Sequence, residues 1–351
     1  MKNGSSQRAK LFLMSALAVA LLSAVSAAAA ELHVPGDFPT IQAALDAAVP
    51  GDTILVDPGT YMENLRFNGK NVTLESTDGP GVTTIQGVGG TTVDIGPGGA
   101  IIGFTITGGT ATFGAGMSVN GGGTAITGNV FDGNRQGSGG FGAAIGGNNS
   151  APIIQQNVFQ SNSCDGQFLS GVVSFVNTSS PRIVNNIFQD NPCRAINMTL
   201  PAGSLPQVIN NTIVRNVSGV RVDRRIPTNQ QVYRNNLIVG NQIGLEVDFG
   251  VESFNPTWEN NLVFNNGTDY RGIADQTGEN GNISADPLLV DLDNGDYHLQ
   301  SGSPAIGAGS TQGAPDVDFD GVLRGNSIDI GAFQFVPGEP NQAVPLNRVR
   351  R

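Results

Sequence analysis

The chain has 351 residues, with 29 acidic against 18 basic side chains and a formal net charge of −11 at pH 7. This acidic balance argues against nucleic acid and anionic membranes as partners. Only 13% of the residues are charged, yet short apolar runs recur along the chain and are punctuated by glycine and asparagine. That pattern favours many short strands joined by tight turns over a disordered chain.

The first thirty residues are typical of an export signal. Three basic residues precede an apolar run over residues 11–22, and Ala28 and Ala30 supply the small-x-small pattern of a cleavage site. The apolar run is short for a membrane span, and no later stretch offers one. We therefore predict a signal peptide over 1–30, no span in the mature chain, and a secreted, extracellular or cell-surface location after bacterial export. A retained anchor is the alternative.

A short helix is predicted next. Thr40 is a suitable N-cap, and the apolar residues Ile41, Ala44, Leu45 and Ala48 share one helical face behind it. A helix this short is suited to cover the first coil of a stacked structure.

A repeat dominates the middle of the chain. Six segments share the form apolar-x-x-Asn-apolar-apolar-x-x-Asn, from ITGNVFDGN at 126–134 to WENNLVFNN at 258–266. Their first asparagines are Asn129, Asn157, Asn186, Asn211, Asn236 and Asn261, and the second follows five residues later in each copy. The segment at 101–109 is a degenerate copy with Phe104 in the first asparagine position.

A period near 25 residues is too short for two packed helices and supplies three short strands. One repeat is then one coil of a solenoid whose strands stack in parallel, ~4.8 Å apart. Aligned asparagines would form ladders of amide hydrogen bonds at one bend. We predict an all-β fold: a right-handed, single-stranded parallel β-helix of about 25 residues per coil, with an N-terminal capping helix and a C-terminal cap.

Two segments resemble a known superfamily. Residues 34–74 resemble the opening of pectate-lyase-like β-helix proteins, and residues 286–309 with 318–333 resemble the C-terminal module of many bacterial secreted β-helix proteins. Residues 286–335 also break the period and change the composition. We therefore predict a β-helix domain over 31–285, a closing C-terminal cap module over 286–335 and a flexible tail over 336–351. The resemblance does not select a reaction, because the superfamily includes lyases, hydrolases, epimerases and non-catalytic surface proteins.

The two cysteines occupy the same position on neighbouring coils. Cys164 and Cys193 each lie seven residues after the first asparagine of their copy. Stacked Cα atoms ~4.8 Å apart fall within disulfide range, and an exported protein meets an oxidising compartment. We predict a structural disulfide; two stacked free thiols are the alternative.

Charged residues align on two successive coils. GVRVD at 219–223 and GLEVD at 244–248 match at a spacing of 25. Alternation places valine and leucine inside and places Arg221, Asp223, Glu246 and Asp248 outside, pointing to solvent. Stacked carboxylates must share a proton, bind a cation or be neutralised by an arginine such as Arg224 or Arg225.

The C-terminal segment contains a second candidate metal site. Residues 316–321, DVDFDG, match the start of a calcium loop, but the twelfth position is Ser327 where a glutamate is expected. A looser Ca²⁺ site at Asp316, Asp318 and Asp320 and a set of turn-forming aspartates are the two interpretations.

Two functions fit these observations. The first is a secreted, monomeric protein that binds or processes polysaccharide on its outer face. As an enzyme it would be a Ca²⁺-dependent uronate lyase, with Arg221 as base and Asp223, Glu246 and Asp248 holding the ion, or less readily a glycoside hydrolase. The second is a non-catalytic surface, matrix or adhesin-like rod.

Overall fold

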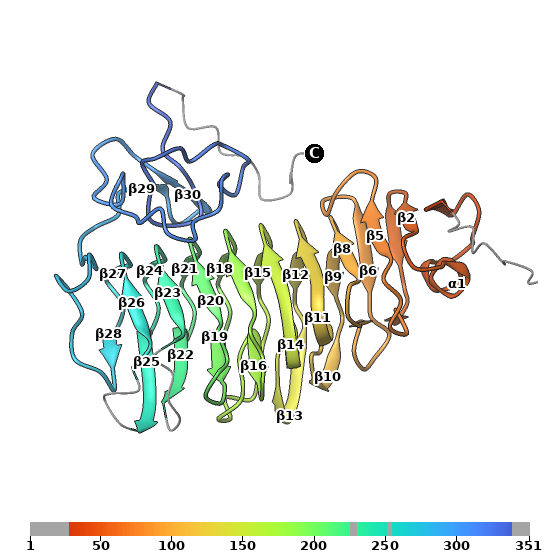
Figure 1. The fold of residues 1–351 in the computed structure, drawn as a ribbon, viewed down its shortest axis with the longest axis horizontal. Helices are drawn as coiled ribbons and strands as arrows, with labels where there is room; N and C mark the ends of the chain where they lie inside the picture. The colour runs from red at the N-terminus through yellow and green to blue at the C-terminus, as the bar shows by residue number, and fades with distance from the viewer. Residues whose placement is uncertain (1–27, 225–229, 251–254, 339–351) are drawn as a thin grey trace, which may run out of the picture.

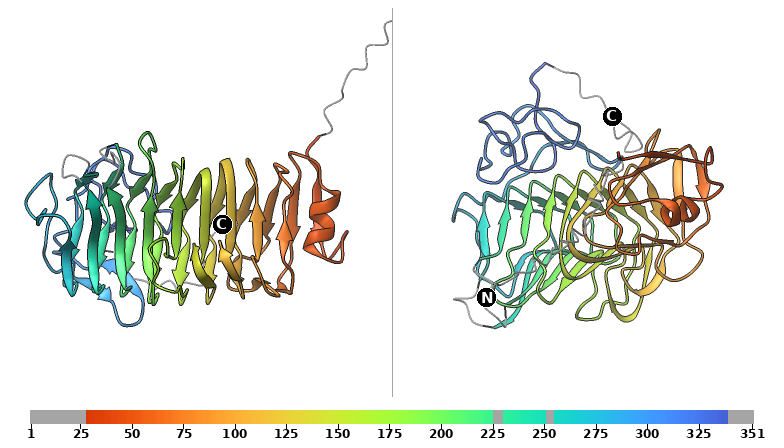
Figure 2. Two further views of the ribbon diagram at one scale, coloured as in Figure 1. Left: turned by 90° about the horizontal axis from the view of Figure 1, so that it is seen from below. Right: turned by 45° about the vertical axis from the view of Figure 1, so that its right-hand side comes forward.

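The computed structural model describes residues 28–224, 230–250 and 255–338 and is a right-handed parallel β-helix (Figure 1). The coils stack along one axis, as the view from below shows in Figure 2. The predicted signal peptide lies outside the described residues, apart from 28–30. Within the described part, no helix is long and apolar enough to cross a membrane.

Two large parallel sheets form the walls of the solenoid. Sheet A contains β1 (Glu31–Val34), β2 (Thr53–Val56), β4 (Leu65–Arg66), β5 (Thr73–Ser76), β7 (Val93–Ile95), β8 (Ala100–Ile102), β11 (Met117–Thr127), β14 (Ile145–Gln155), β16 (Val173–Val176), β17 (Arg182–Val184), β19 (Arg194–Thr199), β20 (Gln207–Ile209), β22 (Ser218–Arg224), β23 (Val232–Arg234), β25 (Ile243–Gly250), β26 (Thr257–Glu259) and β28 (Thr268–Arg271). Sheet B contains β3 (Gly59–Tyr61), β6 (Thr83–Gln86), β9 (Thr105–Thr107), β12 (Val130–Asp132), β15 (Val158–Gln160), β18 (Ile187–Gln189), β21 (Thr212–Val214), β24 (Leu237–Val239) and β27 (Leu262–Phe264).

Two small sheets complete the described structure. Sheet C pairs β10 (Thr110–Phe113) with β13 (Arg135–Phe141) in parallel. An antiparallel pair, β29 (Leu289–Asp291) and β30 (Asp296–Leu299), lies in the C-terminal module.

In the core, residues at equivalent positions of successive coils stack on one another. Phe131, Phe159 and Phe188 pair in register along sheet B, and their ring centroids lie 5.0 and 4.5 Å apart. All three are fully buried. An apolar side chain thus meets the same kind of neighbour above and below, which keeps the coils in one register.

The predicted asparagine ladder is confirmed. Each first asparagine donates its Nδ2 to the Oδ1 of the next copy at 3.0–3.1 Å, from Asn129 to Asn261 and on to Asn282. A parallel ladder joins the second asparagines, from Asn134 to Asn266, at 2.8–3.2 Å. Each Oδ1 also accepts the backbone N–H of its neighbour, as Asn211 does from Asn186 at 3.0 Å. The ladders therefore satisfy the backbone at two buried bends.

In the later coils, the residue before the first asparagine is also an asparagine, and it contacts the C-terminal module rather than the ladder. Asn185, Asn210, Asn235 and Asn260 have φ between 50° and 57°, a conformation that asparagine tolerates better than most residues. Their side chains bond outward to Val317, Asp329, Ser310 and Ala308, all in the C-terminal module. In each of these Asn–Asn pairs, the second side chain therefore joins the ladder and the first binds the C-terminal module.

The predicted N-terminal helix is α1 (Ile41–Ala47), with Thr40 as its N-cap. The Glu63 carboxylate accepts the N–H groups of Ile41 and Gln42 at 3.0 and 2.9 Å, and Lys70 Nζ donates to two carbonyls of the last turn at 2.8 and 2.7 Å. A negative charge at the N-terminus of a helix and a positive charge at its C-terminus both interact favourably with the helix dipole. The first coil therefore holds its cap at both ends.

The C-terminal module lies along the flank of the solenoid rather than across its last coil (Figure 1). Its residues Tyr297, Leu299, Ile330 and Phe333 form one apolar cluster with the outward-facing residues of sheet B. Those partners include Val130, Val158, Ile187, Val214, Leu237 and Leu262, one from each of six successive coils. The module therefore covers an apolar stripe that would otherwise face water.

Candidate functional site

The four charged residues predicted on the third strand lie in the predicted register. Arg221 pairs with Glu246 and Asp223 with Asp248 between β22 and β25, and the alternate residues of both strands lie in the apolar core. The preceding coils place Asn197 and Ser174 in the same outward row.

The expectation that these charges point to solvent is wrong. Arg221, Glu246 and Asp223 are 0, 1 and 3% exposed, and the Asp248 side chain is 28% exposed. The residues do lie outside the coil, but a segment crosses over them: the Phe168 ring lies 4.1 Å from the Arg221 guanidinium carbon. Strand alternation distinguishes the inside of a coil from its outside and carries no information about loops that cover the outside.

Two buried charges, Arg221 and Glu246, form an arginine–carboxylate network with partly exposed neighbours. We call it the outer-face network: Arg194, Arg221, Glu246, Asp248 and Arg271. Arg221 donates to Asp248 at 2.6 and 2.8 Å and to the Asn197 amide oxygen at 2.8 Å. Glu246 bonds Arg271 and lies 3.6 Å from Arg194 and 3.9 Å from Arg221. Arginine thus neutralises both carboxylates. Arg225 and the side chain of Arg224 lie outside the described part of the chain.

This network does not fit a calcium ion or an eliminating base. Calcium needs several free oxygen ligands, whereas Glu246 lies among three guanidinium groups and Asp248 Oδ2 accepts two hydrogen bonds from Arg221. Within residues 28–224, 230–250 and 255–338, no three His, Cys, Asp or Glu side chains are arranged to hold a metal ion. Arg221 is enclosed and paired, so a substrate proton has no route to it.

The second candidate calcium set is also spread apart. Both oxygens of Asp318 are occupied by backbone N–H groups, those of Asp320 and Val322 at 2.9 and 2.8 Å and that of Gln334 at 2.8 Å. The Asp320 carboxylate bonds His298 Nε2 at 2.9 Å. Asp316 meets Arg324 through its main-chain carbonyl. These aspartates therefore organise turns of the C-terminal module.

His298 is held between two carboxylates in that module. Its Nδ1 lies 2.6 Å from Asp296 and its Nε2 2.9 Å from Asp320, and its ring lies against Phe333. Burial by itself would lower the pKa of His298, but the bonds to Asp320 and Asp296 outweigh it and raise the pKa above its ordinary value near 6.5.

We expect His298→Gln to destabilise the protein in a pH-dependent manner. Because the folded-state pKa is raised, the two ion pairs contribute fully below pH 6.5 and are lost as the pH rises through the folded-state value. The variant should lose about 1–2 kcal/mol of unfolding free energy at pH 6 and much less at pH 9. Urea titrations at both pH values measure this; an equal loss at both would contradict a charged His298.

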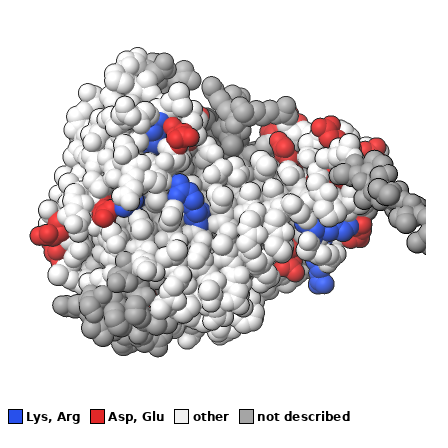
Figure 3. All heavy atoms as spheres, viewed as in Figure 1, with Lys and Arg blue, Asp and Glu red and all other residues white. Residues whose placement is uncertain are grey.

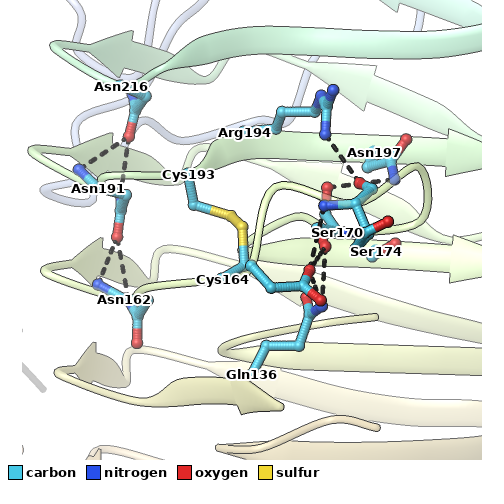
Figure 4. Close-up of a disulfide and its surroundings, with 12 residues drawn as sticks. Gln136, Asn162, Cys164, Ser170, Ser174, Asn191, Cys193, Arg194, Asn197 and Asn216 are labelled. Atoms are coloured by element: carbon cyan, nitrogen blue, oxygen red, sulfur yellow. Dashed lines mark hydrogen bonds between the residues drawn. A yellow bond between two sulfur atoms is a disulfide. The ribbon is translucent and has the colours of Figure 1, made fainter. Parts of the chain in front are cut away.

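The predicted disulfide is present. Cys164 and Cys193 are bonded across neighbouring coils, with Cα atoms 5.7 Å apart, and the described residues contain no free cysteine (Figure 4).

Two surface pockets lie at one bend of the solenoid. The upstream pocket, of about 330 Å³, is lined by Thr110, Arg135, Gln136, Gly137, Ser138, Ser163, Cys164 and Asp165. The downstream pocket, of about 450 Å³, is lined by Asp190, Asn191, Pro192, Arg215, Asn216, Val217, Gly240 and Gln242. We call them together the edge pockets.

The edge pockets occupy equivalent positions of the repeat. The residue after the second asparagine position is Thr110, Arg135 and Ser163 in the upstream pocket, and Pro192, Val217 and Gln242 in the downstream one. Register confirms the stacking, since Thr110 pairs with Arg135 and Arg135 with Ser163. Six coils at ~4.8 Å per coil place the two ends of this row about 24 Å apart.

The charges of the edge pockets are fixed in place. In the downstream pocket Arg215 holds Asp190 through two bonds, of 2.6 and 2.7 Å. In the upstream pocket Asp165 accepts from Gly139 N at 2.7 Å and from Gln167 N at 3.1 Å, and also bonds Ser170. Burial opposes the shift, but these bonds keep the pKa of Asp165 below its ordinary value. Asp165 therefore stays ionised at neutral pH.

Sequence reasoning missed these pockets. A weak signal was present: the position after the second asparagine is polar in four of six coils (Thr110, Arg135, Ser163 and Gln242), next to positions that are apolar or asparagine in nearly every copy. Nothing local distinguishes such a polar position from an ordinary turn, and only the stacking of coils turns it into a row.

A model of the family described as periplasmic copper-binding protein (NosD) matches residues 45–282, more than half of the chain. The chain belongs to this family. No curated protein matches it. Among solved structures, the pectate lyase Pel9A is similar at 15% identity and a TM-score of 0.41, covering 88% of this chain and 96% of that one. A pectin methylesterase from Aspergillus niger is similar at 14% identity and a TM-score of 0.34, covering 75% of this chain and 86% of the other. At these identities and TM-scores, no conclusion about this chain rests on the two structures.

The described residues of this family member do not assemble a copper site. Copper prefers histidine, cysteine and methionine ligands. His298 is engaged on both ring nitrogens, and His33 lies on β1 at the opposite end of the chain. Both cysteines form the disulfide, and Met117 and Met198 are buried in the core. Met62 is exposed, but one thioether does not make a copper site.

Proposed function

We propose that this protein binds a polysaccharide chain along the edge pockets and does not cleave it. The observation that carries the proposal is the alignment of two pockets at one position of the repeat, along the axis of a rigid solenoid. An extended polymer that follows the axis meets the same bend coil after coil.

The lining favours a hydroxyl-rich ligand. Donors and acceptors line both pockets, as a sugar chain with many hydroxyl groups requires: Arg135, Ser138 and Asp165 upstream, Asp190 and Gln242 downstream. A peptide strand has little to pair with, because the backbone here is used between coils: Val217 N donates to Cys193 O and Ile243 N to Val217 O.

The charge favours a neutral or sparsely charged glycan. The chain carries a net charge of −11, and most of the surface in Figure 3 is uncharged, with several basic side chains next to acidic ones. A polyanion would be repelled by the protein as a whole.

Binding without cleavage follows from the state of the carboxylates. Glycoside hydrolysis requires a protonated acid and a second free carboxylate. Asp165 is held ionised and Asp190 is paired with Arg215, so neither pocket offers a proton donor.

Calorimetry with a panel of neutral polysaccharides tests this proposal. We expect Arg135→Ala and Gln242→Ala each to weaken binding about five-fold, since each removes about one hydrogen bond. Arg66→Ala, an exposed arginine away from both pockets, is the matched control and should not change the affinity.

Ligand length gives a second readout. Because both pockets lie on one rigid body, an oligosaccharide that spans about 24 Å should bind more tightly than one that fills a single pocket. If no polysaccharide binds, or if Arg66→Ala weakens binding as much as Arg135→Ala, the proposal is wrong. A non-catalytic rod is then the remaining function.

A further inference from the structure

A short segment covers the outer-face network and begins in the wall of the upstream pocket. This segment, residues 165–171, is called the strap. Four of its successive carbonyls accept hydrogen bonds from side chains of sheet A. Gln167 O accepts from Arg194 at 3.0 Å, Phe168 O and Ser170 O from Asn197 at 3.2 and 3.3 Å, and Leu169 O from Ser174 at 2.8 Å. Figure 4 shows Ser170 beside the donors Arg194, Asn197 and Ser174.

The strap is fixed at its base by two neighbouring residues. Cys164, immediately before it, is bonded to Cys193, which itself precedes Arg194. Asp165 then binds Gly139 N and closes the strap on Ser170. The covalent bond therefore holds Asp165 in the wall of the upstream pocket and keeps Gln167 within reach of Arg194.

The disulfide also lies on the row that joins the edge pockets. Cys164 lines the upstream pocket and follows Ser163, while Cys193 follows Pro192 of the downstream pocket. Cys193 is 2% exposed, whereas Cys164 is partly exposed. A reductant therefore reaches the bond through Cys164, from the side on which a ligand would lie.

We propose that the Cys164–Cys193 bond is a clamp that keeps the strap closed over Arg221 and keeps the upstream pocket formed, so that its reduction opens both. The part of the proposal that concerns the pocket rests on the proposed function. A thiolate of an external dithiol attacks Cys164 Sγ and releases Cys193 as a thiol. The second thiol of the reagent then displaces Cys164, so that two electrons and two protons pass to the protein and the reagent leaves as its own disulfide.

Loss of the clamp leaves the strap held by hydrogen bonds, because none of its residues belongs to either buried apolar cluster. A segment held in this way opens locally at small cost, whereas the stacked coils remain closed. The opening carries Asp165 out of the pocket wall and removes Phe168 from Arg221.

Hydrogen exchange and arginine labelling test the clamp without any ligand. We expect the folded protein, after reduction by a dithiol, to exchange the strap amides at least ten-fold faster, while the amides at the asparagine ladders keep their protection. Phenylglyoxal should label Arg221 only after reduction. The double variant Cys164→Ser with Cys193→Ser should behave like the reduced protein. If that variant does not fold, reduction of the folded wild-type protein still tests the clamp.

An unchanged exchange rate of the strap, or labelling of Arg221 in the oxidised protein, would overturn the clamp whether or not a glycan binds. If the strap opens on reduction but the oxidised protein binds no polysaccharide, the clamp stands and the proposed function fails. If both hold, reduction should weaken binding about ten-fold, and a bound glycan should slow reduction, because it covers Cys164.

Discussion

Replacing Arg221 by methionine should lower the free energy of unfolding by about 3–5 kcal/mol. The change leaves Asp248 and the buried amide oxygen of Asn197 without their donor, and it removes one of the three guanidinium groups around Glu246. Arg221 is fully buried, bonds Asp248 twice and lies 3.9 Å from Glu246. Methionine fills much of the same volume, so the loss reports the charge rather than a cavity. Chemical denaturation measures it.

A triple variant distinguishes the cost of leaving carboxylates unpaired from the contribution of the ion pairs themselves. Arg221→Met combined with Glu246→Gln and Asp248→Asn removes the cation and both anions together, and we expect it to recover a large part of the lost stability. Arg66→Met is the control for an exposed arginine and should change stability by less than about 0.5 kcal/mol. If Arg221→Met were as mild as Arg66→Met, the network would be an ordinary surface ion pair.

A break in the asparagine ladder should be comparably costly. In Asn211→Ala, the backbone N–H of Asn186 loses its acceptor, and the carbonyls of Ile183 and Ile209 lose their donor, all inside the coil. Each buried group left unpaired costs ~1–3 kcal/mol, so we expect a loss of about 3–5 kcal/mol.

The control for the ladder is an asparagine of the same chain that faces water. Asn120 is exposed and makes one side-chain bond, of 3.3 Å, to Ser118. Asn120→Ala should therefore change the unfolding free energy by less than about 0.5 kcal/mol. Equal losses for the two variants would show that the ladder contributes no more than a surface amide.

The repeat made the coil, its register and the disulfide predictable. The first asparagine of each copy marks where a coil begins, although the coils differ in length. Counting from it shows which residues lie above one another, so the ladder from Asn129 to Asn261, the pairing of Arg221 with Glu246 and the bond between Cys164 and Cys193 are all predictable.

The repeat does not predict how segments outside it pack against the coils. The strap residue Phe168 meets Arg221 from a coil that is four residues longer than the coils that follow it. The module residue Tyr297 packs against sheet B from far along the chain. Exposure of the charged patch and closure of the last coil by the module were both inferred from periodicity alone. Periodicity gives no information about segments that lie outside the repeat.

The doubled asparagines illustrate the same limit. Asn210 and Asn211 are neighbours of one type, yet Asn211 enters the ladder and Asn210 bonds the module carbonyls of Asp329 and Gly331. The difference arises from the left-handed backbone at Asn210, with φ of 55°, which turns its side chain outward. The sequence motif marks the pair but not which member serves the module.

The most direct measurement of the central claim is a hydrogen-exchange footprint of the oxidised protein with a long neutral polysaccharide, combined with the size of the polysaccharide before and after incubation. We predict new protection in the segments at Thr110, Arg135, Ser163, Val217 and Gln242, none in β3 and β6 in the N-terminal coils of sheet B, and an unchanged chain length. Protection confined to another face, or shortening of the polysaccharide, would contradict the account.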